Sequence, residues 1–406
     1  MSIDRKVIEN IHNGLPQKTR RRIKKTVKAI VKAKERGGKV VAVIGSGPNL
    51  HEGITTLIAE LMRKGIIDGV STSSAVISHE MSGTLEVVKR IDGAAFGLER
   101  SRLPSDGYFE VAIVSKKRLG EIGDLVPVDP DFYWKLRRAR GNTIIKVAGN
   151  VAYPTGLYTE RIARYVLVLS KRYGVPFEFM AGLGADPHTM IGAGSELKKP
   201  VLVTVPQLVG GGEVGLLLGD SLPVSERCFR VAQLLDSADV IIESAIALSQ
   251  EIHDGPFERF TGHGIWADWE GGWTYSLAGK TIVRIDLDPD LEKVWRMECR
   301  SSSVTAAVHS GAPKTKDLRV PFRMEMSGFA RIPESLPIIG DIGEIWPVIA
   351  THVADALDIH LDFMCYRQSL PAGQKVREWI VKNVKPMCKE RMFKSAIGLR
   401  PVNGEK

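Results

Sequence analysis

The stretch VVAVIGSG, residues 40–47, decides the fold, because five apolar residues run directly into a Gly-Ser-Gly turn. A continuous apolar run between glycines is typical of a strand that is buried on both faces of a parallel sheet. Similar runs recur, and helical patterns near 57–62, 75–90, 157–173 and 223–235 lie between them. The other runs cover 66–70, 111–114, 201–205, 240–242 and 281–285. This alternation predicts an α/β fold with a doubly wound, mostly parallel, Rossmann-like sheet.

The two ends of the chain differ in character from this middle part. Residues 1–38 are polar, basic and helical in pattern, and two glycines end that pattern. Residues 300–330 have the Ser, Gly and Pro content of an exposed connection, and amphipathic helical patterns follow near 342–357 and 373–384. We therefore expect a basic helical arm (1–38), a Rossmann-like catalytic domain (39–299) and a helical C-terminal extension (300–406).

Composition restricts the classes of protein to consider. The chain has 406 residues, 44% of them hydrophobic, so it can bury a large core. It lacks both the roughly 20-residue apolar run of a membrane helix and a signal peptide, so we expect a cytoplasmic protein. The net charge of +9 is concentrated near the ends, without an aromatic-interleaved basic motif. This favours solvated helix faces or subunit contacts over nucleic-acid binding. The four cysteines have no metal-binding spacing, and we expect no metal.

Candidate binding residues follow the predicted strands, because ligands of an open parallel sheet bind beyond the carboxyl ends of its strands. Gly47 and Asn49 follow the first strand, in a turn that lacks the full GxGxxG pattern and is either a phosphate site or a tight connection. The hydroxyl residues after the second strand either cap a helix or contact a nucleotide; they are Thr72, Ser73 and Ser74. Acidic or hydroxyl side chains after later strands suit ribose or a helix cap; they are Glu243, Ser244 and Asp286.

Three consecutive glycines, Gly210 to Gly212, precede Glu213. Glycine loses more backbone entropy on ordering than any other residue. The loop therefore indicates either a close approach of backbone to a ligand or an ordinary surface loop.

Aromatic and charged side chains gather in residues 251–275, which hold three of the seven tryptophans. Aromatic rings beside carboxylates suit an ammonium group, although an aromatic loop at a subunit interface explains them equally well. The substrate-binding candidates are Asp268, Trp269, Glu270 and Trp273. The candidates for a catalytic base are Glu213, His253 and His263.

The chain resembles deoxyhypusine synthases, chiefly over residues 47–81. The matching positions are Asn49, Gly53, Ile54, Asp68 and Thr72. The resemblance implies a Rossmann-like fold, bound NAD and a homotetramer with active sites between subunits. It also implies that NAD lies along Asn49, Thr72, Ser73, Ser74, Glu243 and Asp286. The NAD-dependent ornithine cyclodeaminase type is similar in broad fold and supports small-molecule amine chemistry.

The chain departs from that family where the family's chemistry is done. The Ser-Trp-Gly-Lys motif is missing, and Lys280 is either the nearest candidate for the catalytic lysine or an ordinary strand-edge lysine. We therefore expect an NAD-dependent enzyme that acts on a small amine or amino acid through an imine. The alternatives are a redox-neutral lyase, isomerase or hydrolase on the same scaffold, and a non-enzymatic nucleotide-binding protein.

Overall fold

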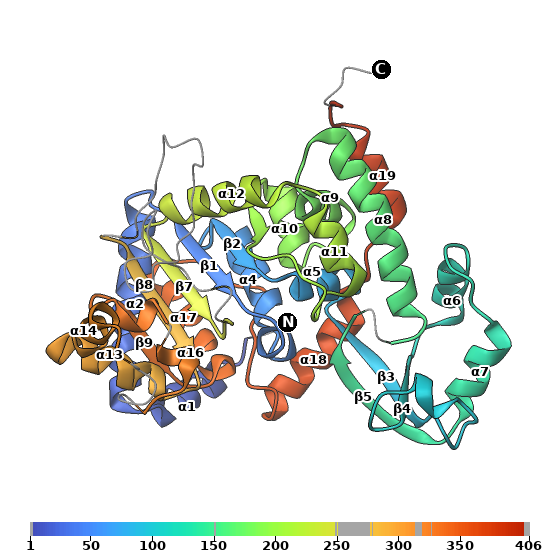
Figure 1. The fold of residues 1–406 in the computed structure, drawn as a ribbon, viewed down its shortest axis with the longest axis horizontal. Helices are drawn as coiled ribbons and strands as arrows, with labels where there is room; N and C mark the ends of the chain where they lie inside the picture. The colour runs from blue at the N-terminus through green and yellow to red at the C-terminus, as the bar shows by residue number, and fades with distance from the viewer. Residues whose placement is uncertain are drawn as a thin grey trace. The chain divides into compact units, whose positions relative to one another are not determined.

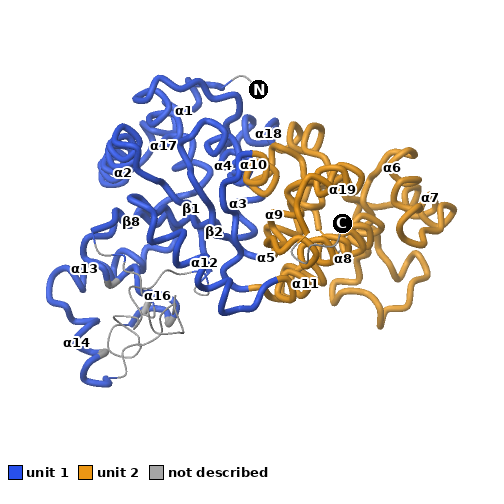
Figure 2. The backbone as a smooth tube through the Cα atoms, turned by 90° about the horizontal axis from the view of Figure 1, so that it is seen from above, with its two compact units in different colours: residues 1–73, 197–205, 222–376 blue, residues 74–196, 206–221, 377–406 orange. Residues whose placement is uncertain are grey.

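A computed structural model describes residues 3–149, 152–247, 250, 277, 279–312, 319–325 and 327–401. The chain divides into two compact units, shown in two colours in Figure 2. Unit 1 comprises residues 1–73, 197–205 and 222–376, and unit 2 comprises residues 74–196, 206–221 and 377–406. Both units therefore combine distant parts of the sequence. The linear division at residues 38 and 299 stays a prediction about domain organisation.

A six-stranded sheet forms the centre of unit 1 (Figure 1). Its strands, in their order across the sheet, are β6 (Val201–Val203), β2 (Gly69–Thr72), β1 (Val40–Ile44), β7 (Val240–Ser244), β8 (Thr281–Asp286) and β9 (Leu336–Ile339). All five neighbouring pairs are parallel. Numbered by their appearance in the chain, these strands run 3-2-1-4-5-6, the order of dinucleotide-binding Rossmann folds. The predicted fold class is confirmed.

Helices cover both faces of this sheet. The helices of unit 1 include α1 (Arg5–Gly14), α2 (Gln17–Glu35), α3 (Pro48–His51), α4 (Ile54–Arg63), α12 (Val224–Asp236), α13 (Asp290–Ser301), α14 (Ser303–Ser310), α16 (Phe322–Glu325) and α17 (Ile342–Ala356). Side chains of α12 and α13 share a buried apolar cluster with Val41 and Val43 of β1. The helices α2 and α17 contact the strands without joining that cluster, and they lie on the other face (Figure 1).

The N-terminal helices pack onto unit 1 through regularly spaced residues. In α2 the buried side chains include Ile23, Thr26, Ile30 and Ala33, which follow one another at helical spacing. The helix α2 contacts β1, β7 and β9. The basic residues of α2 lie mostly on its outer face, since Arg21, Lys24, Lys25 and Lys28 are exposed. The expected arm is thus a packed layer of unit 1.

The segment beyond residue 300 is mostly helical, as expected, but it also supplies a strand. The helix α17 and the later α18 (Pro371–Asn383) match the two helical patterns predicted there. The strand β9 pairs with β8 as the sixth strand of the sheet. Four residues with only two fully buried side chains gave too weak a pattern for sequence-based prediction. Among the described residues, no helix combines the length and apolarity that crossing a membrane requires.

Unit 2 contains an antiparallel sheet of β4 (Tyr108–Ala112), β3 (Leu85–Asp92) and β5 (Gly141–Val147), in that order. The helices of unit 2 include α5 (Ser74–Met81), α6 (Lys116–Gly123), α7 (Pro130–Arg138), α8 (Thr155–Tyr173), α9 (Phe177–Gly184), α10 (Met190–Leu197), α11 (Gly212–Gly219) and α19 (Lys389–Ala396). A short 3₁₀ turn, η1, covers Arg100–Arg102, and η3 of unit 1 covers Phe329–Arg331.

Two predictions about this region were wrong. The run at 111–114 was expected in the parallel sheet, whereas β4 belongs to the antiparallel one. The helix expected over 75–90 ends at Met81, and β3 begins at Leu85. Gly83 and Thr84 separate the two elements with φ values of 97° and 68°, which a right-handed helix cannot contain. The backbone of Gly83 also lies against Pro386, where a Cβ would come within 3.1 Å of the proline nitrogen.

A buried carboxylate joins two helices of unit 2. The side chain of Glu80, in α5, accepts hydrogen bonds from the backbone N–H groups of Met190 (2.8 Å) and Ile191 (3.0 Å) at the start of α10. Burial raises the pKa of Glu80 from 4.5 to about 8, and the two N–H donors only partly oppose this rise. Unit 2 therefore depends on a carboxyl group that keeps its proton at neutral pH.

We predict that the stability of the protein falls as the pH rises from about 5 to about 8. In this window native Glu80 retains a proton that the unfolded chain has lost, so the free energy of unfolding declines by up to about 1.4 kcal/mol per pH unit. Glu80→Gln should make the decline about half as steep, because Glu86, whose pKa burial also raises to about 8, titrates in the same window. It should also lower stability at pH 5 by about 1 kcal/mol, because Gln offers one acceptor oxygen to two N–H groups.

Urea unfolding across this pH range measures both effects. Glu378→Gln, at an exposed position of unit 2, is the matched control and should leave the profile unchanged. A wild-type profile that is flat between pH 5 and 8, or one that Glu80→Gln leaves equally steep, contradicts the prediction.

Candidate cofactor-binding site

The strand order defines one place where unit 1 can hold a ligand. The chain leaves β1 toward β2 and β6 on one side and leaves β7 toward β8 and β9 on the other. Such a reversal opens a crevice beyond the carboxyl ends of the two central strands. Ile44 and Ser244 are paired at these ends. The candidate site therefore starts from the turns that follow β1 and β7.

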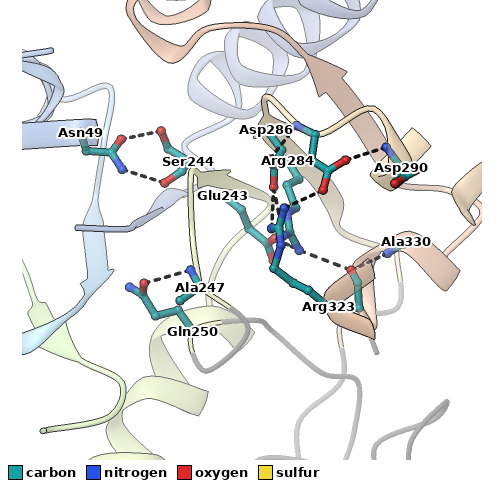
Figure 3. Close-up of polar contacts among 12 residues, drawn as sticks. Asn49, Glu243, Ser244, Ala247, Gln250, Arg284, Asp286, Asp290, Arg323 and Ala330 are labelled. Atoms are coloured by element: carbon teal, nitrogen blue, oxygen red, sulfur yellow. Dashed lines mark hydrogen bonds and ion pairs between the residues drawn. The ribbon is translucent and has the colours of Figure 1, made fainter. Parts of the chain in front are cut away.

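Asn49 and Ser244 lock these two turns together (Figure 3). Asn49 Nδ2 donates to the carbonyls of Gly45 and Ser244, both at 2.9 Å, and its Oδ1 accepts from Ser244 Oγ at 2.7 Å. Trp346 Nε1, from α17, donates to the same Ser244 Oγ at 2.8 Å. All three side chains are buried. Asn49 and Ser244 therefore build the floor of the site, and their polar atoms are satisfied by the protein itself.

Glycine is required where the turns meet. A Cβ at Gly45 would lie 2.0 Å from the carbonyl oxygen of Ala245, so only glycine permits this approach of the two strand ends. Gly47, two residues on, has a φ of 64°, and a Cβ there would meet no atom within 4 Å. Among the described residues, no acceptor bonds the N–H groups of Ser46 or Gly47. An open turn with two available N–H groups fits the diphosphate of a dinucleotide.

The hydroxyl residues at the end of β2 and just after it belong to different units. Thr72, in β2, donates to the carbonyl of Ile44 at 2.8 Å and is fully buried, so it ties β2 to β1. Ser73 is the last residue of this part of unit 1, whereas Ser74 belongs to unit 2. Ser74 Oγ donates to the carbonyl of Gln207 at 3.0 Å. The structure thus brings Gly47, Asn49, Thr72 and Ser244 to one edge of the sheet, and Ser74 serves unit 2.

The glycine loop is explained by packing within unit 2. A Cβ at Gly215 would lie 2.0 Å from the carbonyl of Gln207, and one at Gly211 would lie 2.9 Å from Ser74 Oγ. The glycines thus let α11 approach the start of α5. Glu213, in α11, accepts a hydrogen bond from Arg164 Nε at 2.6 Å. Its role as a base is untested, and unit 1 does not contain it.

Three acidic and two arginine side chains form a second cluster, at the ends of β7 and β8 (Figure 3). Arg284, with no exposed surface, donates to Asp286 at 3.2 Å and lies 3.9 Å from Glu243. Arg323 donates to Asp286 at 3.2 Å and to Asp288 at 3.0 Å. Asp286 also accepts from the N–H of Asp288 at 3.0 Å. Both oxygens of Asp286 are therefore engaged, and this carboxylate holds Arg323 beside the site.

Lys280 lies away from these residues. It precedes β8, and its Nζ donates to the backbone carbonyls of Asp236 and Ala238. A strand rises about 3.3 Å per residue, so Lys280 is roughly 20 Å from Asp286 along β8. The structure gives it the contacts of a strand-edge lysine. His253, His263, Asp268, Trp269, Glu270 and Trp273 lie outside the described residues.

Four residues of the site were not identified from the sequence. They are Arg284, Arg323, Trp346 and Gln250, the last of which donates to the carbonyl of Ile44 at 3.2 Å. Arg284 carried a usable signal, because it interrupts the apolar strand 281–285 and a charge at such a position must be paired. Arg323 and Trp346 lie far along the chain from the strand ends, and neither they nor Gln250 stood in a pattern that indicated a role. Among the described residues, no group of three His, Cys, Asp or Glu side chains could hold a metal ion.

The chain matches no protein-family model and no curated protein. Solved structures similar to it include a variant of AgrE bound to L-arginine, AgrE in a ternary complex with ornithine and NAD+, and a LOR/SDH protein from Methanococcus maripaludis S2. Their identities are 11%, 14% and 10%, with TM-scores of 0.39, 0.38 and 0.39, over 88%, 87% and 85% of this chain.

The chain spans about a third of the length of the two AgrE chains, 34% in each, and 70% of the LOR/SDH protein. Similarity at this level assigns neither a family nor a ligand. The assignment to the Rossmann-like folds follows from the strand order of this chain itself.

We predict that Asn49→Ala destabilises the protein by about 1–3 kcal/mol, because it leaves buried polar groups of the two turns without their partner. Equilibrium denaturation in urea measures the change. The control is Asn10→Ala, at an exposed position of α1, which should alter stability by less than about 0.5 kcal/mol. Equal losses of stability in the two variants would show that the hydrogen bonds of Asn49 to the two turns do not stabilise the protein.

Proposed function

We propose that this protein is an NAD-dependent enzyme that acts on a small amine or amino acid, with the dinucleotide bound beyond β1 and β7. The observation that carries the proposal is the 3-2-1-4-5-6 strand order together with the open Gly45-Ser46-Gly47 turn at its reversal point. Each feature alone is common, but together they match the site at which Rossmann folds hold dinucleotides. The resemblance of residues 47–81 to deoxyhypusine synthases supports the same cofactor.

The residues of unit 1 have distinct roles in this proposal. The N–H groups of Ser46 and Gly47 receive the diphosphate, while Asn49, Ser244 and Trp346 keep the two turns in place. Arg323, which is 38% exposed, offers the remaining donors of its guanidinium to ribose or phosphate oxygens. When bound, NAD supplies a hydride acceptor. The imine formed from an amine would then be hydrolysed, cyclised or attacked by a second amine.

The amine substrate is proposed on the character of residues 251–275 and on the family resemblance. A redox-neutral lyase, isomerase or hydrolase remains the second candidate, because Lys280 is bonded as an edge lysine and the family's catalytic motif is missing. A homotetramer and a cytoplasmic location are proposed on the resemblance and on the sequence. Light scattering after size-exclusion chromatography would test the assembly.

We predict that Gly47→Ala weakens NAD binding about tenfold or more, since the new methyl group fills the space above the turn. The matched control is Gly37→Ala. Gly37 also has a positive φ and open space around it, but it precedes the amino end of β1. Both variants should lose a similar stability, about 1–2 kcal/mol, and only Gly47→Ala should lose NAD affinity. Calorimetric titration with NAD measures the affinity. Equal NAD affinity of the two variants refutes the proposed location.

A second measurement separates the two candidate functions. The protein is incubated with NAD and a panel of small amines and amino acids, and NADH absorbance is followed alongside consumption of each compound. NADH formation, transient or sustained, supports the redox enzyme. Consumption of a compound while NAD stays oxidised and can be omitted supports the redox-neutral one.

A further inference from the structure

A cavity of about 750 Å³ lies within unit 2. Residues of β3, α6, the start of α8 and the segment 381–390 line it. Aliphatic side chains form one part of its wall, among them Leu85, Val87, Ile113, Val384 and Met387. Charged side chains, including Lys117, Lys385 and Lys389, line it as well. Cavities of this size with a few polar groups in an apolar wall are typical of sites for small molecules.

One carboxyl group in this wall lacks the pairing that buried acids normally have. Glu86, in β3, lines the cavity and is only 9% exposed. The hydroxyl of Thr155 and the N–H of Gly149 act on this carboxyl group as hydrogen-bond donors and lower its pKa, while Oε1 has no hydrogen-bond partner in the described part of the chain. Lys146, opposite Glu86 in β5, directs its ammonium group to Glu110 instead. A buried carboxyl group without a close counter-ion keeps its proton instead of ionising, so a cationic ligand would supply the partner that the ionised form lacks.

Other polar groups of the wall are already engaged. Arg118 lies over the ring of Tyr158 at 4.1 Å and donates to Glu121 at 3.2 Å. Tyr158 donates to the carbonyl of Met387 at 3.3 Å. The thiol of Cys388 lies 3.4 Å from Glu390 Oε2. Glu86 is therefore the buried carboxyl group of this wall with an oxygen that no described residue bonds.

We propose that this cavity binds a small aliphatic amine in its ammonium form, with Glu86 as the counter-ion and the aliphatic wall around the carbon chain. An ammonium group donates up to three hydrogen bonds and pairs with a carboxylate most strongly where water is excluded. An inorganic cation would gain nothing from the aliphatic part of the wall.

The protonation of Glu86 supports the proposal and provides its signature. Burial raises the pKa of Glu86 from 4.5 to about 8, and Lys146 only partly opposes this. Without an amine, Glu86 is therefore mostly protonated at pH 7. The ammonium group favours the ionised carboxylate, so binding releases close to one proton to the buffer. Affinity should rise with pH toward about 8 and level off above it.

This amine site lies within unit 2 alone, in addition to the substrate contacts proposed at residues 251–275, so the inference goes beyond the proposed function. The two remain separable, because amine binding is measured without NAD and NAD binding is measured in the Glu86→Gln variant. Amine binding without NAD binding would keep this site and remove the redox enzyme. NAD binding without amine binding would remove this site and leave the proposed NAD site in place.

The experiment is calorimetric titration of the full chain with 1,4-diaminobutane, propylamine and L-lysine, and with butyrate as the anionic counterpart. Titrations in two buffers of different ionisation enthalpy give the number of protons released. We expect binding of at least one amine, no binding of butyrate and release of close to one proton at pH 7. Glu86→Gln should weaken amine binding about tenfold or more and abolish the proton release.

The matched control is Glu121→Gln, which removes a carboxylate of the same wall that is already paired with Arg118. It should change amine affinity by less than about threefold. Thermal unfolding of each variant shows whether it is folded. No amine binding by the wild-type chain, or binding without proton release that Glu86→Gln leaves intact, overturns the proposal.

Discussion

The site depends on the close approach of the β1 turn to the end of β7. Gly45 permits the approach, because any Cβ would collide with the carbonyl of Ala245, and Asn49 fixes it by bonding to both turns. Ser244 extends the contact to Trp346 of α17, which lies a hundred residues further along the chain. One short hydrogen-bond network therefore joins the turn after β1, the end of β7 and the helix α17. The shape of the crevice follows from it.

The sequence revealed the parallel sheet because its strands are buried on both faces. Continuous apolar runs such as 40–44 and 240–242 can be recognised without knowledge of the partners. The strand β3 could not be recognised in this way. It carries Glu86, Lys89 and Arg90 among apolar residues, and only its pairing with β4 and β5 places those charges. The helix expected at 75–90 therefore extended wrongly over the residues of β3.

Within the site, positions could be predicted but roles could not. Gly47, Ser244 and Asp286 follow strands, so their place at the carboxyl edge follows from the strands alone. Whether a polar side chain there faces a ligand or the protein depends on partners far away in the chain. Asp286, which the resemblance places along NAD, shows this, because Arg284 and Arg323 bond its Oδ2 and the N–H of Asp288 bonds its Oδ1. Residues 251–276, which hold the proposed substrate contacts, lie outside the described part.

The carboxyl groups near the two candidate sites differ in their partners: those of unit 1 are paired with arginines, whereas Glu86 of unit 2 keeps a proton. In unit 1, Asp286 and Asp288 are matched by arginines, so a cationic ligand would have to break existing ion pairs. In unit 2, burial raises the pKa of Glu86 to about 8, and Lys146, which is bonded to Glu110, only partly opposes this rise. Releasing one proton costs far less than breaking a buried pair. The ammonium ligand proposed for the unit 2 cavity therefore needs to displace only a proton, while the arginines and free N–H groups of unit 1 suit the anionic diphosphate of a dinucleotide.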